Sequence, residues 1–155
     1  MKSLRAFVLV SLFLGGCGAM QPKATAPEPS IAQAWVKTFN ECRVDALVAL
    51  YDAEALFWPT TSRSLAAKPE DVRRYFDAAC KLGKAVGFKF EGVTESVKLY
   101  GDVAISAGQM TATFRNRQGQ LQDLPLRFSL AARKVDGRWL IVEHHSSAMP
   151  APPSQ

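Results

Sequence analysis

The stretch LPLRFSLAARKVDGRWLIVEHHSS, residues 124–147, decides the fold because apolar and polar residues alternate on both sides of one turn signal. Alternation of this kind is typical of strands with one buried face. The apolar positions of its first half are Leu124, Leu126, Phe128 and Leu130. The dipeptide Asp136-Gly137 favours a two-residue hairpin turn. The stretch therefore predicts two antiparallel strands, the second over residues 138–147.

The residues before this hairpin predict two more strands. Between residues 93 and 99, valine and leucine alternate with threonine, serine and lysine. Residues 103–114 form a long Thr/Ala-rich segment that ends in a polar turn at residues 116–119. Hairpin-linked strands of this kind indicate an antiparallel sheet.

Helical patterns come earlier in the chain. Ser30 is a candidate N-cap for a helix with an apolar stripe. That stripe consists of Ile31, Trp35, Phe39 and Cys42. We expect a second helix at residues 45–51, a short strand at residues 55–58, and a third helix from Pro69 that carries Val72, Tyr75, Phe76 and Ala79. The order predicts an α+β cone-shaped fold, with three N-terminal helices packed on a curved antiparallel sheet that encloses a conical cavity.

Length and composition fit one small domain. The chain has 155 residues, of which 48% are apolar and 21% charged, as in ordinary globular proteins. Three cysteines are too few for a disulfide-dense scaffold. We expect a folded domain over residues 30–149 and a flexible tail at residues 150–155.

The first residues have the pattern of an export signal. Lys2 and Arg5 precede an uncharged apolar run at residues 6–14 that is too short to span a bilayer. The run ends in Leu14-Gly15-Gly16-Cys17, which resembles the bacterial lipobox. That resemblance implies a signal peptide at residues 1–16 and a lipidated Cys17; the alternative is an ordinary signal peptide. Residues 17–29, rich in alanine and proline, would be a tether.

This interpretation places the protein in the bacterial periplasm, held by its lipid anchor and, since Gly18 follows the cysteine, on the outer membrane by analogy with known sorting rules. Two of the 19 basic residues and none of the 14 acidic ones lie in residues 1–16, so removing them lowers the net charge from +5 to +3. No run of lysine and arginine remains, and we therefore expect no nucleic-acid partner.

A set of short motifs carries a family resemblance. They are Trp58-Pro59-Thr60, Tyr75-Phe76, Arg127-Phe128 and the run from Trp139 through His144-His145-Ser146-Ser147 to Met149-Pro150. In this order they resemble the association-domain family of calcium/calmodulin-dependent protein kinase II, within the nuclear-transport-factor-2-like (SnoaL-like) superfamily. The resemblance is greater still to the bacterial subgroup that includes the iota-class carbonic anhydrases. The sequence has neither the glycine-rich ATP-binding loop nor the catalytic loop of a protein kinase.

The resemblance, together with the chemistry of the residues, implies a pocket for a small anion. Hydroxyls, imidazoles and a guanidinium suit carbon dioxide or bicarbonate. The expected catalytic residues are Thr60, Tyr75, Ser147 and His145, and the expected substrate-binding residues are Arg127, His144 and Ser146. Relatives place a further arginine near the pocket, for which Arg63 is the candidate.

Strand alternation divides these residues between two faces. It predicts that His144 and Ser146 share one face, whereas His145 and Ser147 share the other with Trp139 and Ile141. It does not say which pair lines the cavity. Thr60, Tyr75 and Ser147 are expected to converge on it from a loop, a helix and a strand.

We expect no metal and no other cofactor, because the two adjacent histidines and two helical cysteines do not have the spacing of a zinc site. Cys42 and Cys80 could form a disulfide in an oxidising compartment or remain two buried thiols.

Two classes of function stay open. One is a metal-free carbonic anhydrase, and the other is a non-enzymatic module that binds a small ligand or oligomerises. A homodimer is expected in either case, through the sheet face that the helices leave uncovered.

Overall fold

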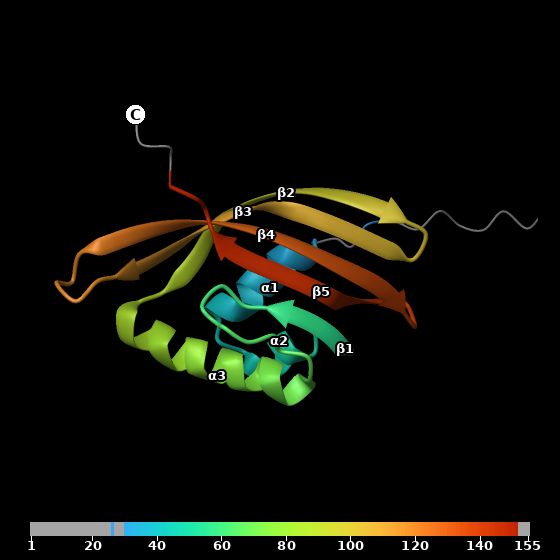
Figure 1. Cartoon of the computed structure of the whole chain (residues 1–155), viewed down its shortest axis with the longest axis horizontal. Coiled ribbons are helices and arrows are strands. Elements are labelled where there is room, and N and C mark those ends of the chain that lie inside the picture. The colour runs from blue at the N-terminus through green and yellow to red at the C-terminus, as the bar shows by residue number, and fades with distance from the viewer. Residues whose placement is uncertain (1–25, 27–29, 152–155) are drawn as a thin grey trace, which may run out of the picture.

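The computed structural model describes Ala26 and residues 30–151. The expected signal peptide, Cys17 and all of the tether except Ala26 lie outside the described residues, as do residues 152–155. The elements, in chain order, are α1 (Ile31–Asn40), α2 (Val44–Val48), β1 (Tyr51–Trp58), α3 (Pro69–Val86), β2 (Lys89–Tyr100), β3 (Val103–Arg115), β4 (Leu121–Val135) and β5 (Arg138–Ala148). The helices lie against one face of a curved sheet (Figure 1), which confirms the α+β cone fold.

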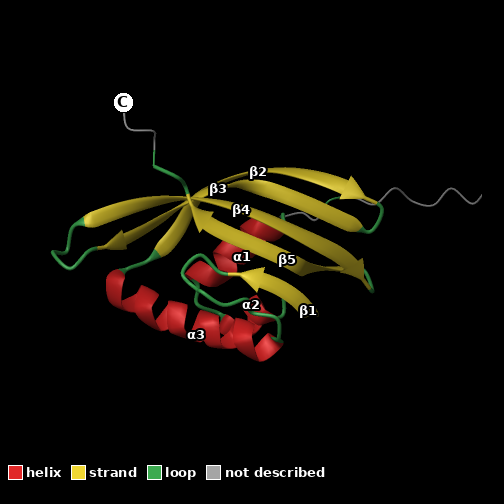
Figure 2. Ribbon diagram, viewed as in Figure 1, coloured by secondary structure: helices red, strands yellow, loops and turns green. Residues whose placement is uncertain are grey.

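The sheet is mostly antiparallel. Its strand order is β1-β5-β4-β3-β2, and β2 to β5 form a meander of antiparallel pairs (Figure 2). Asp136 and Gly137 both have positive φ, 49° and 80°, as a two-residue turn of the predicted type requires. The edge strand β1 pairs with β5 in parallel, which the sequence did not indicate.

Local signals set the helix starts as predicted. The Ser30 side chain accepts a hydrogen bond from the Gln33 backbone N–H at 3.1 Å, so it caps α1. Pro69 is the first residue of α3, followed by Glu70 and Asp71, whose charges favour the positive end of the helix dipole. These signals act over a few residues, and the tertiary structure does not override them.

The second helix is shorter than predicted. It ends at Val48, and Tyr51 is the first residue of β1 rather than the last residue of a helix. Tyr51 lies opposite Ile141 of β5. Its hydroxyl bonds to Trp35 and His144 inside the core. These partners are distant in sequence, and their pairing outweighs the local helical pattern.

A β-bulge changes the predicted faces of β5. Glu143 lies opposite Ala131 and Ile141 opposite Ala132, so Val142 is the extra residue of the bulge. Ile141, His144 and Ser146 are consequently all buried. The prediction that Ile141 shares a face with His145 and Ser147 is wrong, because one inserted residue reverses the alternation on its amino-terminal side.

An aromatic cluster fills the space between the helices and the sheet. Its rings are stacked, edge-to-face or tilted, with centroids 4.8–6.2 Å apart in the contacts of Phe57, Phe76 and Trp35 with their neighbours. We use the name aromatic cluster for Trp35, Phe39, Tyr51, Phe57, Phe76, Phe90 and His144. These rings bury large apolar areas and form the main part of the core.

Candidate functional site

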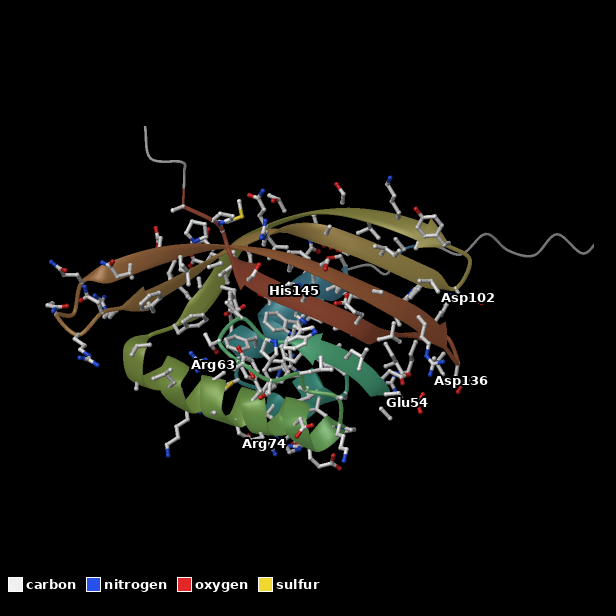
Figure 3. The ribbon with its side chains drawn as sticks, viewed as in Figure 1. Glu54, Arg63, Arg74, Asp102, Asp136 and His145 are labelled. Atoms are coloured by element: carbon white, nitrogen blue, oxygen red, sulfur yellow. The ribbon has the colours of Figure 1, made fainter. Side chains whose placement is uncertain are left out.

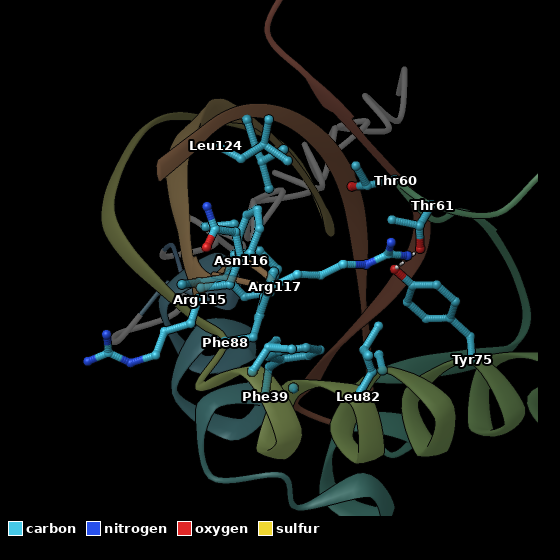
Figure 4. A pocket seen from close by; sticks show the side chains of 17 residues that line it. Phe39, Thr60, Thr61, Tyr75, Leu82, Phe88, Arg115, Asn116, Arg117 and Leu124 are labelled. Carbon is cyan, nitrogen blue, oxygen red and sulfur yellow. Dashed lines mark hydrogen bonds between the residues drawn. The ribbon is translucent and has the colours of Figure 1, made fainter. Parts of the chain in front are cut away.

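A cavity of about 460 Å³ lies beside the aromatic cluster, between α3 and strands β2 to β4 (Figure 4). Its wall is mainly apolar. The side chains that form most of this wall are Phe39, Leu82, Phe88, Phe114, Leu124 and Leu126. The volume is in the range of pockets that hold small organic molecules. We treat this cavity as the candidate site.

One side of the cavity is polar and built from hydroxyls. Thr60 and Thr61 follow β1, and Tyr75 projects from α3. The Thr60 hydroxyl is 2.6 Å from that of Ser146 on β5, and the Thr61 hydroxyl is 3.4 Å from that of Tyr75. Burial raises the pKa of Tyr75 above its ordinary value of 10.0, so this phenol stays protonated at neutral pH. The structure therefore brings Thr60, Thr61 and Tyr75 to one side of the cavity, and the buried Ser146 lies behind Thr60.

His144 lies deeper, inside the aromatic cluster. The Trp35 indole N–H donates to the Tyr51 hydroxyl at 2.9 Å. The Tyr51 hydroxyl is 2.8 Å from His144 Nδ1 and can donate to it, which leaves the imidazole proton on Nε2. Burial lowers the pKa of His144 from 6.5 to about 3. His144 is thus a neutral core residue at physiological pH, stacked on Phe57.

The remaining predicted residues lie on the opposite face of the sheet. His145 is exposed on β5 (Figure 3), and the Arg127 Nε donates to the Ser147 hydroxyl at 3.3 Å on the same face. Their neighbours Leu126, Phe128 and Ser146 point inward. Within one chain, the structure therefore corrects the expectation that Ser147 converges with Thr60 and Tyr75. Alternation along β4 and β5 gives Ser146, not Ser147, the inward position.

The arginine at the cavity differs from those we expected. Arg63 is exposed in the loop between β1 and α3 (Figure 3). Arg117, on the β3–β4 hairpin, extends across the cavity toward Thr61 and Tyr75 (Figure 4). Sequence reasoning missed Arg117 because residues 116–119 had only the pattern of a polar turn. The available signal was the pair of arginines on either side of Asn116, Arg115 and Arg117.

Cys42 and Cys80 are both free thiols in the structure. Cys80 is buried on α3, whereas Cys42 lies in the turn after α1 with a φ of 49°. Burial, with a smaller contribution from the neighbouring Cys42, raises the pKa of Cys80 to about 12. At neutral pH the Cys80 thiol is therefore protonated and weakly nucleophilic.

Among residues 30–151, no three histidine, cysteine or acidic side chains come together as a set of metal ligands. In the same part of the chain, no helix combines the length and the apolar character that crossing a bilayer requires.

The cone of three helices on a curved five-stranded sheet, with a cavity between them, defines the chain as a nuclear-transport-factor-2-like protein. Residues 29–150 match the calcium/calmodulin-dependent protein kinase II association domain. The chain belongs to that family.

Solved structures agree with this assignment. A protein from Xanthomonas campestris, described as an association domain of the same family, is 28% identical with a TM-score of 0.68 and covers 84% of this chain and 96% of its own. A nuclear-transport-factor-2-like protein from Novosphingobium aromaticivorans is 12% identical, with a TM-score of 0.69 and coverages of 79% and 80%. A ketosteroid isomerase-like protein from Erwinia carotovora atroseptica is 17% identical, with a TM-score of 0.63 and coverages of 78% and 92%. The two proteins under 25% identity share the fold alone. No curated protein matches the chain.

Proposed function

We propose that the hydroxyl-lined side of the cavity hydrates carbon dioxide to bicarbonate, in the manner of the iota-class carbonic anhydrases that the sequence resembles. The observation that carries the proposal is the 2.6 Å contact between the hydroxyl of Thr60, which lines the cavity, and the buried hydroxyl of Ser146 behind it. Tyr75 supplies a further neutral hydroxyl on the same side. Apolar side chains next to them suit carbon dioxide, which carries no charge and no net dipole.

The chemistry needs a water molecule held against the carbon of carbon dioxide. Each hydroxyl can donate one hydrogen bond and accept others, so after Thr60 and Ser146 bond to each other one donor and several lone pairs remain. A water bound there would have its oxygen lone pair directed at the carbon. A new carbon–oxygen bond forms, one carbon–oxygen π pair moves to the outer oxygen, and the water loses one proton to solvent. The products are bicarbonate and a proton.

Preorganised donors stabilise the charge that develops on the outer oxygen. The Tyr75 phenol is suited to this because its raised pKa keeps the hydrogen in place. The neutral, hydrogen-bonded His144 keeps β5 in position through its contacts in the aromatic cluster and does not exchange a proton near pH 7. In this proposal, His144 is therefore a positioning residue.

Stopped-flow measurement of carbon dioxide hydration by the full chain tests the proposal. We expect a rate above the buffer blank that a zinc chelator leaves unchanged, with zinc-dependent carbonic anhydrase as the control for the chelator. A rate equal to the blank would overturn the enzymatic function.

The second candidate is a binding module without catalysis. It is favoured by the size of the cavity, because 460 Å³ is far more than carbon dioxide and one water occupy. The same residues would then retain a small ligand. Binding without turnover in the hydration assay would favour this candidate.

We propose that the protein is exported and anchored in the periplasm by a lipidated Cys17. A lipid-modified cysteine with several acyl chains exceeds the two anchoring signals that stable membrane attachment requires. The native protein should fractionate with membranes, and Cys17→Ser should release or mislocalise it. A wild-type protein that stays soluble with a free Cys17 thiol would contradict the anchor.

We also propose a homodimer through the outer face of the sheet. The alternating apolar residues Leu126, Phe128 and Leu130 of β4 are in the core and do not form this face. The outer face has other exposed apolar residues, which are Leu56, Trp58, Val103 and Ile105. Sedimentation equilibrium should give twice the chain mass at micromolar concentration. Ile105→Lys should reduce it to the monomer mass, and a wild-type monomer would contradict the dimer.

A further inference from the structure

The cavity is larger than the proposed hydration reaction needs. Its 460 Å³ would hold about 15 water molecules at the ~30 Å³ that each occupies in the liquid. The wall offers these waters few hydrogen bonds, because phenylalanine, leucine, alanine and valine side chains form most of it. An apolar body of about ten heavy atoms would displace such water favourably.

The charged side chains that line the cavity are all positive. Arg115 and Arg117 are the only charged residues among the cavity-lining side chains of the described chain. The Arg115 Nη1 donates to the Gly119 carbonyl oxygen at 2.9 Å, and the guanidinium points away from the cavity (Figure 4). Arg117 instead points across the cavity toward Thr61 and Tyr75 (Figure 4). Within residues 30–151, no carboxylate lies within 4.0 Å of its guanidinium.

An unpaired guanidinium beside two hydroxyl donors is a site for a carboxylate. Arginine presents a planar set of N–H donors that match the two oxygens of a carboxylate. The Thr61 and Tyr75 hydroxyls bond to each other, so the pair can add one further hydrogen bond. The apolar wall begins directly beside this polar corner, with Leu82 and Phe88 in the same cavity. The arrangement thus has one place for a negative charge and one larger place for an apolar body.

We propose that the cavity binds an amphipathic organic carboxylate, with its carboxylate on Arg117 and its apolar body against Phe88, Phe114 and Leu82. The inference goes beyond the proposed hydration reaction and does not depend on it, because the ligand would be held by Arg117 and the apolar wall rather than by the Thr60–Ser146 pair.

Isothermal titration calorimetry of the full chain with sodium octanoate tests the site. We expect saturable binding of one octanoate per chain. Butyrate has the same charge but lacks four methylene groups, so it should bind more than about a hundredfold more weakly. The alcohol 1-octanol has the apolar body without the charge, and it should bind about tenfold more weakly than octanoate.

Two arginine variants distinguish a direct contact between Arg117 and the carboxylate from the general effect of removing one positive charge. Arg117→Gln should weaken the binding of octanoate about tenfold and leave the affinity for 1-octanol unchanged. Arg115→Gln removes the same charge from the same hairpin, and it should leave octanoate within about twofold because Arg115 points away from the cavity. Leu82→Glu, at an exposed position of the wall, should also weaken octanoate binding by placing a charge against the apolar body of the ligand.

The proposal is overturned if octanoate shows no saturable binding to the wild type. It is equally overturned if 1-octanol binds as tightly as octanoate, or if Arg117→Gln and Arg115→Gln reduce octanoate affinity equally. These results are independent of the hydration rate, so the carboxylate site and the proposed enzyme activity can fail separately.

Discussion

The aromatic cluster and the cavity lie side by side under the same sheet, yet they differ in how their polar groups are satisfied. In the aromatic cluster, two hydrogen bonds join Trp35 to Tyr51 and Tyr51 to His144, and the surrounding rings pack closely around them. In the cavity, the wall is mainly apolar, and Arg117 has no ionic partner among the described residues. The first region stabilises the fold, and the second is available for a ligand.

The largest expected difference between the two regions concerns stability. Phe76 is fully buried in the aromatic cluster, whereas Leu82, six residues further along α3, is 65% exposed at the cavity. Phe76→Ala should lower the free energy of unfolding by about 3–5 kcal/mol, and Leu82→Ala should change it by less than about 0.5 kcal/mol. Urea unfolding measures both. Equal losses would show that the cavity wall is as tightly packed as the cluster.

A pair of tyrosines sharpens the same comparison. Tyr51→Phe removes a buried hydroxyl that bonds to Trp35 and His144, and it should lower the free energy of unfolding by about 1–3 kcal/mol. Tyr75→Phe removes a hydroxyl whose contact with the Thr61 hydroxyl is long, at 3.4 Å, and it should lower the free energy of unfolding by less than about 0.5 kcal/mol. Thermal unfolding of the two variants tests this order. A larger loss for Tyr75→Phe would contradict the division into a structural and a functional region.

The pH dependence of stability should come from the cluster. The folded-state pKa of His144 is lowered from 6.5 to about 3, so below pH 6.5 the unfolded chain binds a proton that the folded chain does not. Stability should therefore fall by about 1.4 kcal/mol per pH unit as the pH decreases below 6.5, and this fall should end near pH 3. Urea unfolding at pH 7.0, 6.0 and 5.0 measures the slope.

A matched histidine pair provides the control. His144→Asn should remove the slope between pH 6.5 and 5, whereas His145→Asn, on the exposed face of the same strand, should retain it. If His144→Asn is too unstable to measure, the slopes of stability against pH for the wild type and His145→Asn still test whether His144 is held neutral. A wild-type stability that does not change between pH 7 and 5 would show that His144 is not held neutral.

The features that local sequence determines were predictable. The Ser30 cap, the start of α3 at Pro69 and the turn at Asp136-Gly137 each depend on a few adjacent residues, and the structure has all three. Tyr51 was placed wrongly because its strand conformation depends on β5, which lies about 90 residues away in the sequence.

The candidate site was predictable only in part, for the same reason. The sequence indicated that His144 and Ser146 alternate with His145 and Ser147, but not which pair faces inward. That choice is set by the packing of β4 and β5 against the helices, and the bulge at Val142 has no local signal. Arg117 lies at the cavity because the β3–β4 hairpin curves over α3, which depends on the curvature of the whole sheet.

The most direct test of the central claim is a comparison of two adjacent serines by stopped-flow carbon dioxide hydration. Ser146 is buried and contacts Thr60 at the cavity, whereas Ser147 contacts Arg127 on the opposite face. We predict that Ser146→Ala lowers the hydration rate about 100-fold, and that Ser147→Ala leaves it within about twofold of the wild type. A lowered hydration rate in Ser147→Ala with the full rate in Ser146→Ala, or no hydration by the wild type, would contradict this prediction.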